Sequence, residues 1–161
     1  MTAHVPWCRV GLCVSRGPGS YRYYNGTALF TFGQGLSYTQ FELSCSAAAQ
    51  LSFSCSVKNT GSVAGDEVVQ VFHSVSSAIR TAAKHPVPIR RLVDFGRVSL
   101  AAGASATLQF TLPKERLALV TASGASMLYA GEHTLTFTRG HGDVVTQRVT
   151  IGHADAFTRT R

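Results

Sequence analysis

The clearest strand pattern in the chain is Thr107-Leu108-Gln109-Phe110-Thr111-Leu112, in which polar and apolar side chains alternate without interruption. Successive side chains of a β-strand point to opposite faces, so this period predicts a strand with one buried face. The same alternation occurs upstream at Phe41, Leu43 and Cys45, and again from Leu51 to Val57. We therefore expect a sheet that covers a core with one face.

Further short apolar runs extend this pattern through the rest of the chain. Strands are predicted at 66–73, 89–95, 98–100, 127–129, 132–138 and 144–151. Asn59–Ser62 and Ala101–Gly103 are typical turns, while Ser74–Pro88 is a looser segment and Pro113–Val120 could close with a helical turn. About seven or eight short strands separated by turns are the pattern of an all-β, antiparallel β-sandwich.

Length and composition exclude several classes of protein. The 161 residues suit one domain, and no run reaches the ~18 to 20 apolar residues of a membrane helix. The net charge of +7 raises the question of a polyanionic partner, but only Arg90 and Arg91 adjoin. Nucleic-acid binding usually requires clustered basic residues, so we expect no nucleic-acid partner. Met1–Ser15 lacks the apolar core of a signal peptide, so the compartment stays open.

The chain offers no recognisable catalytic centre. It has eight carboxylates, of which only Asp66 and Glu67 are adjacent, and consecutive strand residues point to opposite faces. We expect both in solvent at the mouth of a strand. No G-x-S-x-G elbow is present, and Gly33-x-Gly35 lacks the third glycine of a phosphate loop. We predict no catalytic residues and no cofactor in this chain.

Histidine and cysteine spacing gives no metal site. The six histidines show neither H-x-H nor H-E-x-x-H, and we expect His85 and His141 in solvated turns. The four cysteines, Cys8, Cys13, Cys45 and Cys55, contain no C-x-x-C pair and leave three disulfide pairings open. No metal is therefore predicted.

Ordered motifs resemble a known family. Pro18–Gly26 followed by Phe32–Thr39 resembles the stretch that links the last two domains of glycoside hydrolase family 3 enzymes, the β-glucosidases and β-xylosidases. Asn59–Val71 resembles the opening of that family's fibronectin type III-like C-terminal domain. The family's order continues at Leu92–Leu100, at Leu112-Pro113 with Leu117–Val120, and at Ala130–His133. Gln34, Gly96 and Ala102 depart from the usual pattern, in the linker and the turns.

The resemblance implies an immunoglobulin/fibronectin type III-like sandwich at 39–152. It implies an irregular, aromatic-rich extension at 1–38, resembling the end of the preceding α/β domain, and a tail at 153–161. In the family, a (β/α)8 barrel supplies the Asp nucleophile of a retaining reaction, and the next domain usually supplies the acid/base carboxyl. No residue here matches those motifs. The implied role is an accessory module of a glycosidase of carbohydrate catabolism, docked on catalytic domains in cis or in trans.

The aromatic segment gives the candidate docking residues. Seven of the chain's fifteen aromatic residues lie between positions 21 and 41. The predicted docking residues are Tyr21, Arg22, Tyr23, Tyr24, Phe30, Phe32 and Tyr38. The alternatives are that these rings only cap the sandwich, or that the chain is a free-standing interaction or carbohydrate-binding module. We expect Phe72, Phe95 and Tyr129 in the core, which leaves the sandwich without an exposed sugar platform.

Asn25-Gly26-Thr27 is a glycosylation sequon, which matters only if the protein is secreted. The resemblance implies an extracellular or secretory location for the parent enzyme. The sugar that the parent cleaves is left open.

Overall fold

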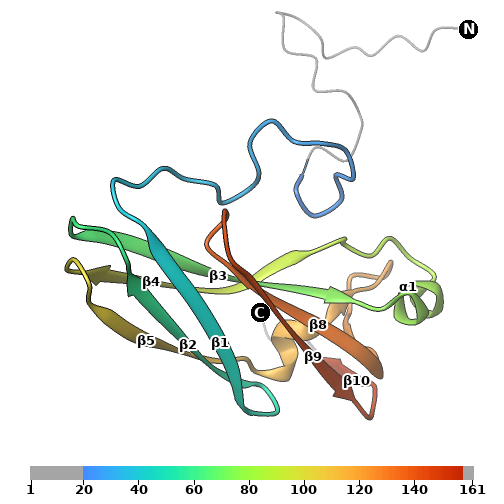
Figure 1. The fold of residues 1–161 in the computed structure, drawn as a ribbon. Helices are drawn as coiled ribbons and strands as arrows, with labels where there is room; N and C mark the ends of the chain where they lie inside the picture. Colours follow the sequence, from blue (N-terminus) through green and yellow to red (C-terminus); the bar gives the residue numbers. More distant parts are fainter. Residues whose placement is uncertain (1–19, 158–161) are drawn as a thin grey trace, which may run out of the picture.

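Strands make up most of the secondary structure of the computed structural model, which describes residues 20–157 (Figure 1). The elements follow one another as β1 (Phe41–Ala49), β2 (Ser52–Asn59), β3 (Gly65–Val75), α1 (Ser77–Ala83), β4 (Arg91–Leu100), β5 (Ser105–Thr111), the 3-10 helix η1 (Lys114–Leu117), β6 (Leu119–Val120), β7 (Ser126–Leu128), β8 (Gly131–Thr138), β9 (Val144–Ile151) and β10 (Asp155–Phe157). The predicted all-β class is confirmed.

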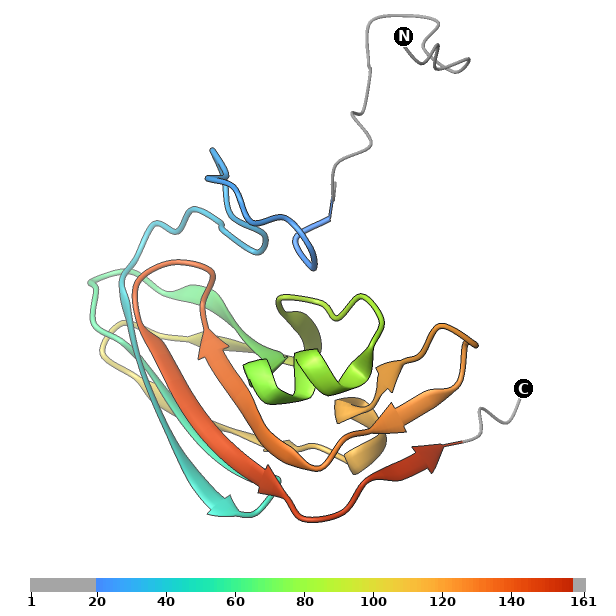
Figure 2. The ribbon, with the colours of Figure 1, turned by 90° about the vertical axis from the view of Figure 1, so that its right-hand side faces the viewer.

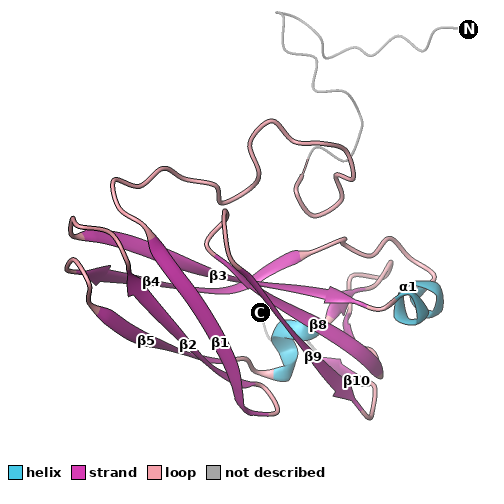
Figure 3. Cartoon of the chain, viewed as in Figure 1, coloured by secondary structure: helices cyan, strands magenta, loops and turns pink. Residues whose placement is uncertain are grey.

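The strands form two main sheets and a small third one (Figures 1 and 3). The first sheet has the order β1-β2-β5, and the second has the order β4-β3-β8-β9. A third sheet, β10-β7-β6, includes residues that we assigned to the tail. All ladders between described strands are antiparallel. The predicted antiparallel sandwich is therefore confirmed.

The two main sheets share one core. Inward residues of the first sheet, such as Phe53 and Phe110, pack with Phe137 of the second, at ring distances of 5.1 and 5.9 Å. Phe110 and Leu112 are buried as the period of 107–112 predicts. Full burial of side chains of this size stabilises the fold by roughly 1.5–3 kcal/mol each, so this core holds the sheets face to face.

Strand β4 differs from the sequence prediction in two ways. It runs without a break through Gly96, where a Cβ would lie only 3.2 Å from Leu108 and 3.3 Å from Phe110 of the facing sheet. The register with β3 also shifts, since Val71 opposes Asp94 while Phe72 opposes Leu92. This bulge adds one residue to β4 and changes which side chains face outward.

The bulge explains why one predicted core residue is exposed. Phe95 opposes Gln70 of β3 on the outer face, and its side chain is 64% exposed. The core prediction for Phe95 is therefore wrong. Phe72 is buried and Tyr129 half-buried, as we expected.

The segment after β3 is more regular than we predicted. Residues 77–83 form α1, and the side chain of Ser76 accepts a hydrogen bond from the N–H of Ile79 at the N-terminus. Ile79 and Ala83 lie one turn apart and are both buried. The segment is rich in small residues, so the sequence showed too weak a helical period to predict this helix. None of the helices within residues 20–157 is long and apolar enough to cross a membrane.

One of the open disulfide pairings is made. Cys45 of β1 and Cys55 of β2 lie opposite each other in the register and form a disulfide. Cys8 and Cys13 lie outside the described residues.

Candidate functional site

Residues 20–38 form an extension without helix or strand that lies on the β3–β4 side of the sandwich (Figure 2). Its first part is held by two hydrogen bonds. The carbonyl of Arg22 accepts from the N–H of Ile89 at 2.6 Å, and the hydroxyl of Tyr21 accepts from the N–H of Leu92 at 3.1 Å. These contacts tie the extension to the start of β4.

The later part of the extension is held at β3 and at the β8–β9 hairpin. Gln70 donates from Nε2 to the carbonyl of Gly33 at 3.2 Å, and Thr31 donates from Oγ1 to the carbonyl of Gly140 at 3.3 Å. Gly140 has a φ of +83°, and a Cβ there would collide with the carbonyl of Gly33. A glycine is therefore required for this close approach.

An aromatic cluster joins the extension to the outer face of the sheet. The rings of Tyr21 and Phe32 stack with centroids 3.9 Å apart. Both meet the ring of Phe72 edge-on, at 5.9 and 6.2 Å. The guanidinium of Arg90 lies 5.0 Å from the centre of the Phe72 ring, a cation–π contact. Phe72 is thus buried beneath the extension. Two of the predicted docking rings, Tyr21 and Phe32, therefore cap the sheet, as the alternative interpretation expects.

Other apolar side chains of the same extension point into solvent. Phe30 is 82% exposed and Tyr38 101% exposed, and the neighbouring Leu29 and Leu36 are exposed to 95% and 102%. Tyr23 and Tyr24 are also exposed. We call Leu29, Phe30, Leu36 and Tyr38 the exposed apolar set. The sequence prediction named Phe30 and Tyr38 but missed the two leucines, which lie in the same Gly- and aromatic-rich stretch.

A cavity of about 840 Å³ opens between the extension and the start of β4. Its lining residues are Ser20, Tyr21, Tyr24, Asn25, Gly26, Ala28, Phe30, Thr31, Phe32, Ile89 and Arg90. Asn25 of the sequon is exposed beside it. The walls are mainly aromatic and apolar, with Arg90 as the charged group.

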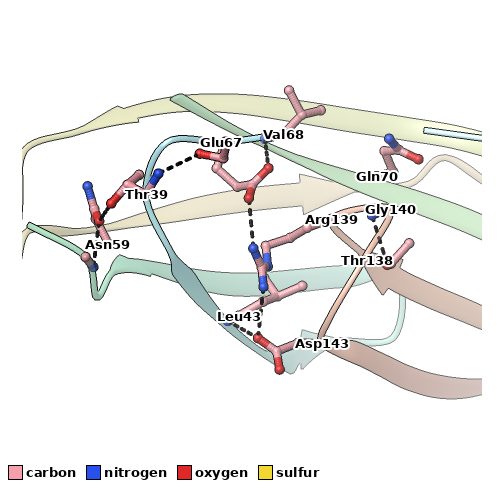
Figure 4. A network of polar contacts seen from close by, with 12 residues as sticks. Thr39, Leu43, Asn59, Glu67, Val68, Gln70, Thr138, Arg139, Gly140 and Asp143 are labelled. Carbon is pink, nitrogen blue, oxygen red and sulfur yellow. Dashed lines mark hydrogen bonds and ion pairs between the residues drawn. The ribbon is translucent and has the colours of Figure 1, made fainter. Parts of the chain in front are cut away.

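An ion-pair network lies at the end of the sandwich near this extension (Figure 4). Arg139 lies between two carboxylates, with its Nη1 2.9 Å from Oε2 of Glu67 and its Nη2 3.5 Å from Oδ2 of Asp143. Asp143 also accepts from the N–H of Leu43 of β1 at 3.0 Å. The expectation that Glu67 is solvated is wrong, because the strand turns it inward toward a cation 72 residues away. Asp66 points the other way and is exposed, as we expected.

Two buried histidines stack at the other end of the same inner face. Nε2 of His133 lies 2.9 Å from the carbonyl of Tyr129, so it carries the proton that it donates. Nδ1 of His133 then accepts from Nε2 of His73 at 2.8 Å. Burial, and next the neighbouring His133, lower the pKa of His73 to about 3. Burial also lowers the pKa of His133. Both rings are neutral at physiological pH.

The remaining histidine and metal predictions can be compared with the structure. His141 is exposed, as we expected, but His85 is half-buried and its Nε2 lies 3.1 Å from the hydroxyl of Tyr129. Within residues 20–157, no three His, Cys, Asp or Glu side chains gather in a way that could hold a metal ion. In the ion-pair network, the guanidinium of Arg139 neutralises the carboxylates of Glu67 and Asp143.

The sandwich matches one family model and a set of larger enzymes. Residues 67–139 match the Fibronectin type III-like domain. The β-xylosidase of Formosa agariphila is 31% identical over 131 residues, which are 76% of this chain and 17% of that protein. The thermostable β-glucosidase B of Acetivibrio thermocellus is 34% identical over 138 residues, 78% of this chain and 18% of that protein.

Solved structures agree with this assignment. The β-glucosidase of Kluyveromyces marxianus has a TM-score of 0.73 at 30% identity, over 85% of this chain and 17% of that one. The fold is thus a fibronectin type III-like domain. The chain belongs with the C-terminal fibronectin type III-like domains of glycoside hydrolase family 3, which confirms the resemblance. It spans less than a fifth of the length of each of these three relatives.

Proposed function

We propose that this chain is the accessory module of a family 3 glycosidase, and that its extension docks on the catalytic domains and stabilises them. The parent enzyme would hydrolyse β-glucosides or β-xylosides, the substrates that the names of the relatives carry. The relatives extend well beyond the matched region.

The exposed apolar set is the observation that carries this proposal. Four large side chains lie almost wholly in solvent within ten residues of one another in sequence. Exposed apolar side chains mark an interaction site when they are gathered, and these four belong to one segment of ten residues. The extension is also held in place at β3, β4 and Gly140, so these side chains are presented from a fixed base. Phe95, exposed on the same outer face, extends the surface.

The test uses the A. thermocellus β-glucosidase B without the region that aligns with this chain, mixed with the purified full chain. We expect association by calorimetry and a higher thermal midpoint for the truncated enzyme. Phe30→Ser and Tyr38→Ser should each weaken association roughly tenfold to hundredfold, since each removes an apolar contact of about 1.5–3 kcal/mol. Val120→Ser is the matched control, because Val120 is an exposed apolar residue of β6 in the small third sheet. Absence of association with the unmodified chain would overturn the proposal.

The cavity favours carbohydrate binding as a second candidate function. Tyr24 and Phe30 line it beside Asn25 and Arg90, and aromatic faces with a few polar groups suit a sugar ring. Titration with xylo- and cello-oligosaccharides would give heat that Tyr24→Ala removes. No heat with either series would count against this candidate.

A further inference from the structure

The side of the sandwich that carries the extension collects arginines. Arg22 lies on the extension, Arg90 lies over Phe72, and Arg91 begins β4. Burial lowers the pKa of Arg91, and the nearby charges of Arg22 and Arg116 lower it further. Of these arginines, Arg90 lines the cavity.

Some of these arginines are fully used within the fold. Arg80 donates to the carbonyls of Val87, Pro88 and Ile89 at 2.8–3.1 Å. Arg91 donates to the carbonyls of Ala118 and Arg116. Such arginines brace loops with their guanidinium groups and have little donor capacity left for a partner.

Arg22 and Arg90 differ from these arginines. Nε of Arg22 is buried and has no hydrogen-bond partner within the described residues. Arg90 stacks on Phe72 and lines the cavity, and no hydrogen bond from its guanidinium is present in residues 20–157. A guanidinium that stacks by its face keeps its N–H edge free, and that edge fits a carboxylate with two parallel hydrogen bonds.

The carboxylates of the chain that form ion pairs do so elsewhere. The pairs within residues 20–157 join Asp66 to Arg97, Glu67 and Asp143 to Arg139, and Glu132 to Arg148. None of them involves Arg22, Arg90 or Arg91.

We propose that a carboxylate of the catalytic body enters the cavity and pairs with Arg90, the arginine that lines it. This inference rests on the proposed docking function and names the chemistry of the partner surface: an acidic side chain set among apolar ones. The aromatic walls exclude water around the pair and the exposed apolar set contacts the surface beside it. Charge then fixes the orientation of docking, while apolar contact supplies most of its affinity.

The test measures association of the full chain with the same truncated β-glucosidase B over a series of NaCl concentrations. Arg90→Gln should raise Kd roughly tenfold to hundredfold, as expected for the loss of a charge-assisted hydrogen bond. This variant should also flatten the dependence of Kd on salt. Lys58→Gln is the matched control, since Lys58 is exposed on β2 of the opposite sheet.

The outcomes separate the two proposals. If the unmodified chain associates but Arg90→Gln keeps its Kd and its salt dependence, the carboxylate pairing is refuted and docking stands. If the unmodified chain does not associate, the docking function itself fails. Arg90→Lys keeps the charge and loses the planar fork, so it should bind more weakly than the parent chain and more tightly than Arg90→Gln. Equal binding by all three would also overturn the pairing. Unfolding curves of each variant confirm that the fold is retained.

Discussion

Lowering the pH should destabilise this domain through the buried histidine pair. His73 is 2% exposed, stacks on His133 and has the cations Arg91 and Arg80 nearby, with no carboxylate among the causes of its shift. Its folded-state pKa is about 3, against 6.5 for a free histidine. At pH values between about 3 and 6.5, the unfolded chain therefore binds a proton at His73 that the folded chain does not bind.

The sign and size of the effect follow from this difference. Because the folded pKa is depressed, the contribution of His73 is fully present above about pH 6.5 and is lost as the pH falls from there toward about 3. One proton linked to folding changes the free energy of unfolding by about 1.4 kcal/mol per pH unit. Between about pH 7 and pH 5, His73 should thus cost the fold about 2 kcal/mol. His133 adds to the loss, since its pKa is also lowered.

Urea unfolding followed by far-UV circular dichroism, at neutral pH and near pH 5, would measure this loss. His73→Gln keeps an N–H donor for Nδ1 of His133 and removes the titrating ring. We expect the variant to lose about 2 kcal/mol less than the parent chain over this interval. Other titrating groups act equally in both proteins and cancel in the comparison. Equal losses in the two proteins, or a His73 resonance that titrates near its ordinary pKa, would refute the reasoning.

Other contacts can be tested in the same unfolding assay. Glu67→Gln removes the nearer of the two carboxylates of Arg139 and leaves Asp143 at 3.5 Å, so it should lower the free energy of unfolding by about 1.5–3 kcal/mol. Gly140→Ala should push the carbonyl of Gly33 off the hairpin, which amide exchange would detect as faster exchange along residues 31–34. Replacing Cys45 and Cys55 by alanine opens a link across 10 residues and should lower the free energy of unfolding by about 2–3 kcal/mol.

Local periodicity predicted the sandwich well because most of its strands bury only one face. The alternation at 107–112 and along 41–45 places apolar side chains in the core in the observed strands. The hairpin over residues 139–143 also forms as its glycines predict, joining β8 to β9. In such strands the period of two and the turn residues are both local signals, so a single sequence contains them.

The polar contacts could not be predicted because they depend on distant segments. Glu67 contacts Arg139 across 72 residues, and His73 contacts His133 across 60. The local sequence around Glu67 or His73 does not indicate either partner. Phe95 is a different case. An ordinary strand would have turned it inward, and the bulge opposite Phe72 turns it out. One inserted residue reverses the face of every later side chain, which a periodicity argument misses.

The aromatic residues of the extension divide between capping, which the structure shows, and docking, which we propose. Tyr21 and Phe32 contribute to the stability of this domain already, because they cover Phe72 and remove it from water. Phe30 and Tyr38 lie in the same segment with nearly complete exposure, so within this chain their rings contribute almost no burial. An irregular segment loses conformational entropy at every residue that it orders. Rings that gain nothing in the isolated chain make physical sense where a second surface covers them, and we infer that this surface is the catalytic body.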